Sequence, residues 1–241
     1  MTAVKDDCVT AFKAVKESID REPFHIGIVL LAGGQSKRMG CNKLLLPWRN
    51  KTVLDAVCEA LRSGWDGVDI LSLTDCKRPF VAITGDDHDK LAPIVRRYDF
   101  EAIQNTRPEQ GQGISIAMGV RHLLDLTPIP LDGILCSVGD QPLLTGPVVG
   151  QIIEAFEEHA DPKTIVVPHY GAAYRSGNPV LFGSHWFSAL QQIDGDQGGK
   201  TIIRGIGKDH VVKVWISDDI GVDIDTPDDF KHLQGRESET L

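Results

Sequence analysis

The fold is decided by the stretch Gly27–Pro47, which reads GIVLLAGGQSKRMGCNKLLLP. It begins with a run of aliphatic residues, 28–31, a pattern typical of a short strand buried on both faces. Gly33 and Gly34 follow, and they allow the backbone to turn sharply and to approach a ligand closely. After a strand and a glycine turn we expect a helix, whose first amide groups attract anions. The stretch therefore predicts a strand, a turn and an anion-attracting helix.

Basic residues and a second strand end extend this prediction. The segment after the glycines carries Lys37, Arg38 and Lys43. A solvated helix face is the simplest interpretation of these cations, but their place beside a double glycine favours contact with a polyphosphate. The apolar run 134–138 leads in a similar way into Gly139-Asp140-Gln141-Pro142. Ligands of open α/β sheets bind beyond the carboxyl ends of the strands, so we expect both segments at one site.

Strand-like and helix-like segments alternate along the rest of the chain. Strands are expected from about Ile26 and at 68–73, 80–84, 102–104, 134–138, 165–168, 179–182 and 211–215. Helices are expected at 4–19, 53–61, 85–98, 111–124, 147–159, 186–193, 200–203 and after 227, with Thr52 as the cap of the second. This alternation predicts an α/β fold, a mostly parallel sheet with helices on both faces. The result is a three-layer, Rossmann-like architecture.

A chain of 241 residues with 41% hydrophobic residues is expected to form one domain. We place that domain at 23–234. Residues 1–22 are expected to form an amphipathic helical extension that packs on the domain rather than on a partner subunit. The polar tail 235–241 is expected to be disordered.

Composition narrows the classes of function. The net charge of −9 argues against nucleic acid as the main partner. The five cysteines are scattered without a C-x-x-C pair, which predicts free thiols in a reducing compartment and neither a zinc site nor a disulfide framework. The first residues lack a signal-peptide pattern, and no run approaches the about 20 apolar residues of a membrane span. We therefore expect a cytoplasmic protein with no membrane partner.

Three aspartates could hold a metal ion. Asp140 follows a buried strand, and Mg²⁺ prefers one or two carboxylates together with phosphate oxygens and waters. Asp223 and Asp225 alternate around Ile224, so in an extended segment both would lie on one face. The simpler interpretations are a turn aspartate for Asp140 and helix capping for the other two. The motifs of phosphate-loop NTPases, dinucleotide-binding domains, α/β-hydrolases and zinc proteases are all missing from the sequence.

Several motifs in a fixed order resemble one family. They are LAGGQSKRMG with KLLLP, GDQPLL, SGNPVLF, GDQGGK and DIDTPDD, and together they span Ile26 to Leu233. This ordered set resembles the nucleotidyltransferases of the molybdenum-cofactor guanylyl/cytidylyl family, most of all the cytidylyl branch and its purine-hydroxylase accessory relatives. The resemblance implies a Rossmann-like nucleotidyltransferase fold. It also implies Mg²⁺-dependent transfer of CMP from CTP to molybdopterin, with release of pyrophosphate.

The resemblance also implies roles for individual residues. Catalysis is assigned to Arg38, Lys43, Asp140 and Asp225. Nucleotide binding is assigned to Leu31, Ala32, Gly33, Gly34, Ser36, Lys37, Arg38, Lys43, Gly113 and Asp140. Binding of the acceptor substrate is assigned to Gln141, Pro142, Arg175, Gly177, Asn178, Asp196 and Lys200. The metal is assigned to Asp140 and Asp225, with Asp223 as second choice.

Two alternatives stay open at this point. The first keeps the fold and changes the substrates: GTP as the donor, or a sugar or alcohol phosphate as the acceptor. The second is a protein of another class, a non-catalytic chaperone that binds the nucleotide or cofactor and delivers it to an apo-molybdoenzyme. An apo-molybdoenzyme is also a candidate partner of the transferase itself.

Overall fold

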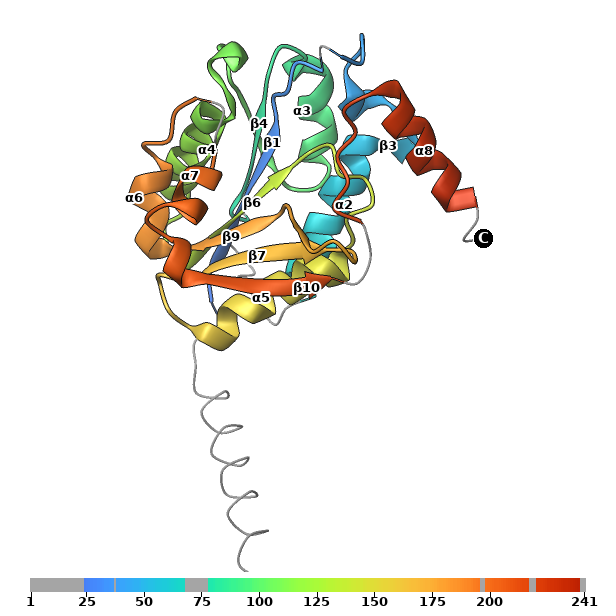
Figure 1. Ribbon diagram of the computed structural model, residues 1–241. Coiled ribbons are helices and arrows are strands. Elements are labelled where there is room, and N and C mark those ends of the chain that lie inside the picture. The colour runs from blue at the N-terminus through green and yellow to red at the C-terminus, as the bar shows by residue number, and fades with distance from the viewer. Residues whose placement is uncertain (1–23, 37, 68–77, 196–197, 217–219, 239–241) are drawn as a thin grey trace, which may run out of the picture.

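The computed structural model describes residues 24–36, 38–67, 78–195, 198–216 and 220–238. A central sheet has the strand order β10-β7-β9-β6-β1-β4-β5, with β8 paired to β7 (Figure 1). In chain order these strands are β1 (Ile26–Ala32), β4 (Phe80–Thr84), β5 (Glu101–Gln104), β6 (Gly133–Val138), β7 (Ile165–Tyr170), β8 (Arg175–Ser176), β9 (Val180–Gly183) and β10 (Val211–Ile216). β8 and β9 pair antiparallel to their neighbours, and the other pairs are parallel. The predicted mostly parallel sheet is confirmed.

The first strand lies at the middle of this sheet. β1 pairs in parallel with β4 on one side and with β6 on the other. Its aliphatic run is buried on both faces, because Ile28 and Leu30 belong to one hydrophobic cluster and Val29 belongs to another. Each face of the sheet therefore has its own core, as expected for a strand without polar positions.

Helices cover both faces of the sheet and complete three layers. On one face α2 (Val53–Asp66), α3 (His88–Arg96) and α5 (Gly146–His159) pack in the first cluster. On the other face α4 (Gln112–Leu126), α6 (Phe187–Leu190) and α7 (Lys200–Arg204) pack in the second (Figure 1). The last helix, α8 (Pro227–Ser238), lies beside the small hairpin β2 (Pro47–Trp48) and β3 (Lys51–Thr52), where Phe230 contacts Trp48. Across the described residues, no helix is both long enough and apolar enough to cross a membrane.

Two segments differ from the sequence expectation. No helix follows Gly33 and Gly34; a loop runs to a short 3-10 helix, η1 (Lys43–Leu45). Ser36 and Gly40 have φ angles of 46° and 68°, and this left-handed backbone cannot continue a right-handed helix. The helix expected at 186–193 is shorter, a 3-10 turn, η3 (Ser184–Trp186), followed by α6.

Parts of both chain ends and the segment 68–77 lie outside the described residues. α8 continues to Ser238, so helix rather than disorder occupies the first part of the tail expected from 235. The N-terminal helix expected at 4–19, the strand expected at 68–73 and residues 239–241 lie outside the described residues.

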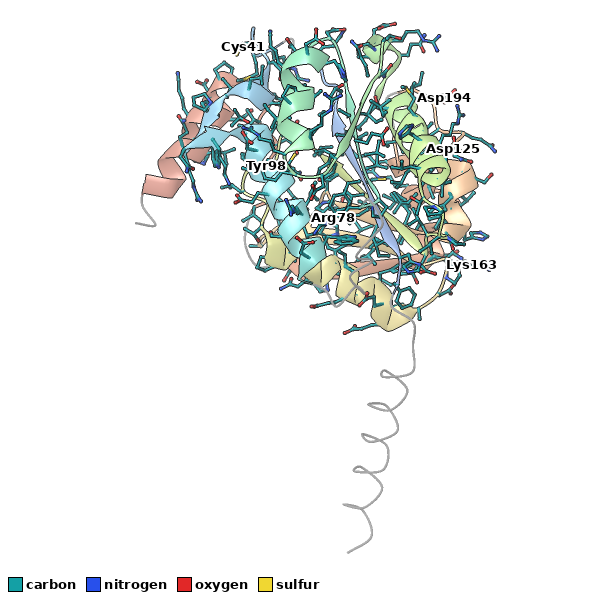
Figure 2. All side chains as sticks on the ribbon, turned by 180° about the vertical axis from the view of Figure 1, so that it is seen from behind. Cys41, Arg78, Tyr98, Asp125, Lys163 and Asp194 are labelled. Atoms are coloured by element: carbon teal, nitrogen blue, oxygen red, sulfur yellow. The ribbon has the colours of Figure 1, made fainter. Side chains whose placement is uncertain are left out.

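The predicted cap of α2 is confirmed and is part of a larger network. The Thr52 hydroxyl accepts from the Asp55 backbone N–H, and the Asp55 carboxylate accepts from the Thr52 backbone N–H at 3.0 Å. Asp55 also accepts from the Arg97 guanidinium at 2.7 Å and from the Tyr98 hydroxyl at 3.1 Å. Figure 2 shows Tyr98 beside α2. Burial alone would raise the pKa of Asp55, but the contacts with Thr52, Arg97 and Tyr98 together lower it.

Asp55→Asn is expected to lower the free energy of unfolding by about 2 kcal/mol at neutral pH, because a charged acceptor of several hydrogen bonds is lost. The folded pKa lies below the unfolded one, so this contribution is present above the unfolded pKa of about 4 and is lost as pH falls through the folded pKa. Urea unfolding of both proteins at pH 7 and near pH 3 measures the effect. An equal difference at both pH values would contradict the role of the charge.

Candidate active site

The carboxyl ends of two neighbouring strands place the glycine turn next to Asp140. β1 ends before Gly33 and Gly34, and β6 ends before Gly139 and Asp140. The Gly139 N–H donates to the Leu31 carbonyl at 3.0 Å, which ties the two strand ends together. From β1 the chain builds β4 and β5 on one side and then returns to add β6 on the other. The site therefore lies at the topological switch of the sheet, as expected from the two strand ends.

A cluster of four charged residues occupies this position. The Lys43 Nζ lies 2.5 Å from Asp140 Oδ2 and 3.2 Å from Asp225 Oδ1. The Arg38 Nη1 lies 3.5 Å from Asp225 Oδ2. These residues come from the loop after β1, from the end of β6 and from the segment before α8. The structure thus brings together the four residues to which catalysis was assigned.

Burial makes Lys43 and Asp140 the central pair of the cluster. Their side chains are 12% and 18% exposed, whereas those of Arg38 and Asp225 are 75% and 54% exposed. Burial alone would lower the pKa of Lys43, but Asp140 first and then Asp225 outweigh burial and raise it. The ammonium group is therefore charged at neutral pH and acts as the counter-ion of both carboxylates.

The two candidate metal ligands near α8 have different partners. Asp225 pairs with Lys43, whereas Asp223 Oδ1 accepts from the Gln141 amide at 2.7 Å. Burial and the negative charge of Asp140 raise the pKa of Asp223, and the hydrogen bond from Gln141 opposes them only in part. Asp223 is thus held by a hydrogen bond, and Asp225 is held by cations.

The donor set fits a divalent cation bound together with phosphates. Among the described residues, no group of three or more histidine, cysteine or acidic side chains gathers at one point. Mg²⁺ does not need such a group, because it takes one or two carboxylates and completes its shell with phosphate oxygens and waters. Asp140 Oδ1 is buried and has no hydrogen-bond partner in the described part of the chain. Asp140 and Asp225 are the carboxylates of the cluster that could hold such an ion together with phosphate oxygens.

Two cavities meet at Asp140. The first, of about 510 Å³, is lined by the glycine loop and by all four charged residues of the cluster. The second, of about 400 Å³, is lined by residues assigned to the acceptor: Gln141, Arg175, Gly177, Asn178 and Lys200. Leu31, Gln112, Val138 and Asp140 line both cavities. A chemical group bound at Asp140 would therefore face a ligand in either of the two cavities.

Five assigned residues either line neither of these two cavities or lie outside the described residues. Ala32 is one of them, and it lines a separate hollow described below. Pro142 is buried behind the site and lines neither cavity. Gly113 was assigned to the nucleotide, but its backbone packs on the turn at Gly195, whose carbonyl accepts from the Gly113 N–H at 2.8 Å. Its neighbours Gln112 and Ser115 line the first cavity instead. Lys37 and Asp196 lie outside the described residues.

A third hollow was not predicted from the sequence. On the other side of the glycine loop, a cavity of about 350 Å³ is lined by Ala32, Gly33, Gly34 and Ser36 together with Gly85, Asp86 and Asp87. A Cβ at Gly85 would come within 2.7 Å of the Gly33 carbonyl, so the two turns can approach only because position 85 is glycine. The available signal was Gly85-Asp86-Asp87 directly after a buried strand, the same arrangement as Gly139-Asp140.

Comparison with known proteins supports this description. The family of MobA-like NTP transferase domains matches residues 28–212. The purine catabolism protein PucB of Bacillus subtilis is 29% identical over 213 residues, which are 87% of this chain and 96% of PucB.

Solved structures of similar proteins agree with the fold. Rv0371c from Mycobacterium tuberculosis has a TM-score of 0.69 at 25% identity, covering 88% of this chain and 98% of Rv0371c. A nucleotidyl transferase from Methanothermobacter has a TM-score of 0.69 at 25% identity, covering 90% of this chain and 99% of that protein. Rv0371c has also been solved in complex with manganese, a structure with a TM-score of 0.61 at 24% identity that covers 87% of this chain and 97% of its own.

Proposed function

The chain belongs to the family of MobA-like NTP transferase domains, and from this premise we propose that it transfers CMP from CTP to molybdopterin. The reaction would depend on Mg²⁺ and release pyrophosphate. At the coarser level, the protein is a nucleotidyltransferase of Rossmann-like fold. The purine catabolism protein PucB is a relative, which is compatible with service to a molybdenum-dependent purine hydroxylase.

One observation carries this proposal, namely that Asp140 lines both cavities. Nucleotidyl transfer needs an acceptor oxygen placed in line with the α-phosphate and the leaving pyrophosphate. A donor in the cavity of the glycine loop and an acceptor in the cavity of Arg175 and Lys200 would meet at Asp140. A simple nucleotide-binding module needs only the first of these cavities.

The charged cluster supplies the chemistry of the donor side. The amides after Gly33 and Gly34 are placed to bind phosphate oxygens, and Arg38 and Lys43 neutralise the charge that develops on pyrophosphate. These amides belong to a loop and not to a helix end. A divalent ion held by Asp140 and Asp225 would neutralise charge at the α-phosphate, and the manganese complex of Rv0371c supports such an ion.

The acceptor brings its own nucleophile. Its terminal phosphate oxygen forms a bond to the α-phosphorus of CTP, and the bond from that phosphorus to the bridging oxygen breaks. No covalent enzyme intermediate is needed, so Cys41 and Cys136 require no catalytic role. Arg175 and Lys200 line the acceptor cavity, and we propose that they bind the anionic end of the acceptor.

Pyrophosphate release tests the reaction. Purified protein is incubated with Mg²⁺, molybdopterin and each of the four NTPs in turn, and we expect release with CTP. In parallel, CTP should raise the melting temperature more than the other NTPs, since a ligand at 100 times its Kd stabilises by about 2.7 kcal/mol.

Each other outcome has a defined meaning. Release with GTP would identify a guanylyltransferase. Release of pyrophosphate only when a sugar or alcohol phosphate replaces molybdopterin would identify that phosphate as the acceptor. Stabilisation by a nucleotide without release, with an acceptor of proven activity, would favour the chaperone and contradict the proposal.

A further inference from the structure

Gln141 is buried directly behind the charged cluster. Its side chain follows Asp140 at the end of β6 and is 1% exposed. Its Nε2 donates to Asp223 Oδ1 at 2.7 Å and to the Gly221 carbonyl at 3.4 Å. These contacts face the segment before α8, and Gln141 also lines the cavity of the residues assigned to the acceptor.

The chemistry of its partners fixes the orientation of this amide. A carbonyl and a carboxylate accept hydrogen bonds and do not donate them, so both require the NH₂ group of Gln141. A buried hydrogen bond to a carboxylate is stronger than one between neutral groups. The NH₂ group of Gln141 therefore hydrogen-bonds to both residue 221 and residue 223.

A backbone hydrogen bond also holds the segment before α8. The Ile224 N–H donates to the Asp140 carbonyl at 3.1 Å. Two consecutive residues at the end of β6 thus bind Gly221, Asp223 and Ile224, and the next residue along the chain is Asp225. The Asp225 side chain is half exposed and forms salt bridges with Lys43 and Arg38, and its backbone N–H donates to Asp229 Oδ2 at 3.2 Å.

We propose that Gln141 is a positioning residue, which holds residues 221–224 through Asp223 and thereby sets the place of Asp225 opposite Asp140. In this arrangement Asp223 is an anchor of the segment, and Asp225 is the second ligand of the divalent ion. This inference rests on the proposed metal pair Asp140 and Asp225. It removes the ambiguity between the two aspartates, because they have different tasks.

Manganese affinity in the presence of α,β-methylene CTP, measured by electron paramagnetic resonance, tests the inference without turnover. Gln141→Glu places two carboxylates against each other and should weaken Mn²⁺ binding by about tenfold or more, as is typical for the loss of a partner behind a metal ligand. Asp223→Ala should do the same. Asp223→Asn keeps an oxygen that can accept from Gln141 and should stay within about threefold of wild type.

The double variant Gln141→Glu with Asp223→Asn supplies the decisive comparison. Its hydrogen bond runs in the reverse direction, from the asparagine amide to the glutamate, so Mn²⁺ affinity should recover to within about fivefold of wild type. Gln151→Glu, an exposed change on α5, is the matched control and should leave the affinity unchanged. Melting temperatures of all variants separate a loss of metal affinity from unfolding.

Several results would overturn the inference. An equal loss of Mn²⁺ affinity in Asp223→Asn and Asp223→Ala would make Asp223 itself a ligand. Wild-type affinity in Gln141→Glu, or no recovery of affinity in the double variant, would contradict the positioning role. Absence of Mn²⁺ binding by the wild-type protein would contradict the metal pair. A failure of the proposed function can be distinguished from a failure of this inference. If no CMP reaches molybdopterin while the affinities follow the expected pattern, the acceptor is wrong and the positioning role stands.

Discussion

Asp140→Asn is expected to lower the rate of pyrophosphate release by about 10³-fold or more, while the nucleotide still binds weakly. Asp140 lines both cavities, carries a buried oxygen that has no hydrogen-bond partner among the described residues, and forms the shortest contact with Lys43. Losing its charge weakens the proposed metal ligand and would remove part of the electrostatic stabilisation of the transition state. The glycine loop and the cations stay in place, so binding is reduced and not abolished.

A pyrophosphate assay with saturating CTP and molybdopterin measures the rate, and calorimetry measures the affinity for CTP. Asp125→Asn is the matched control, because Asp125 is exposed on α4, far from the glycine loop (Figure 2). Full activity of Asp140→Asn would show that the metal assignment is wrong. Complete loss of CTP binding would show that Asp140 acts mainly on the donor and not on the transfer step.

Lys43→Met is expected to change two quantities in opposite directions. The rate of transfer should fall by about 10² to 10³-fold, since a cation on the leaving pyrophosphate is lost. Mn²⁺ binding to the nucleotide-free protein should become tighter, because the ammonium group now lies between the two carboxylates that would hold the ion. A lysine that served only to maintain the fold would lower both quantities together.

The effect on Mn²⁺ binding should not vary with pH between about 6 and 9. The carboxylates raise the pKa of Lys43, so its charge and the stability that depends on it are present below the unfolded pKa of about 10.4 and are lost only as pH rises through the folded pKa. Lys163→Met, at the opposite end of the molecule, is the matched control (Figure 2). Weaker Mn²⁺ binding by Lys43→Met would contradict competition between lysine and metal.

The central strands β1, β4 and β6 were predictable because each carries its signal within a few residues. The runs that became β1, β4 and β6 are apolar apart from Thr84 and Ser137, and a strand buried on both faces favours this pattern. The Thr52 cap was predictable for the same reason, since its partner Asp55 lies three residues away. Local chemistry was sufficient in both cases.

The loop after β1 was not predictable in this way. A glycine turn after a strand usually starts a helix, but here Ser36 adopts a left-handed conformation. Its hydroxyl accepts from the Lys43 N–H at 3.3 Å. The Asn42 side-chain amide donates to the Asp87 carboxylate at 2.9 Å, and Asp87 lies in the turn after β4. These contacts join residues up to 45 positions apart, so no local pattern contains them.

The sequence by itself determined the fold class, the two strand ends that form the site and the identity of its charged residues. The hydrophobic periodicity, the apolar runs and the ordered motifs that indicate them each lie within a short stretch of chain. Only the tertiary structure decided which of these residues touch. Lys43 and Asp225 are 182 residues apart, and Gln141 and Asp223 are 82 apart. Whether an aspartate meets an ammonium group or an amide depends on how parallel strands and the segment before α8 come together, and that is settled by packing of the whole sheet.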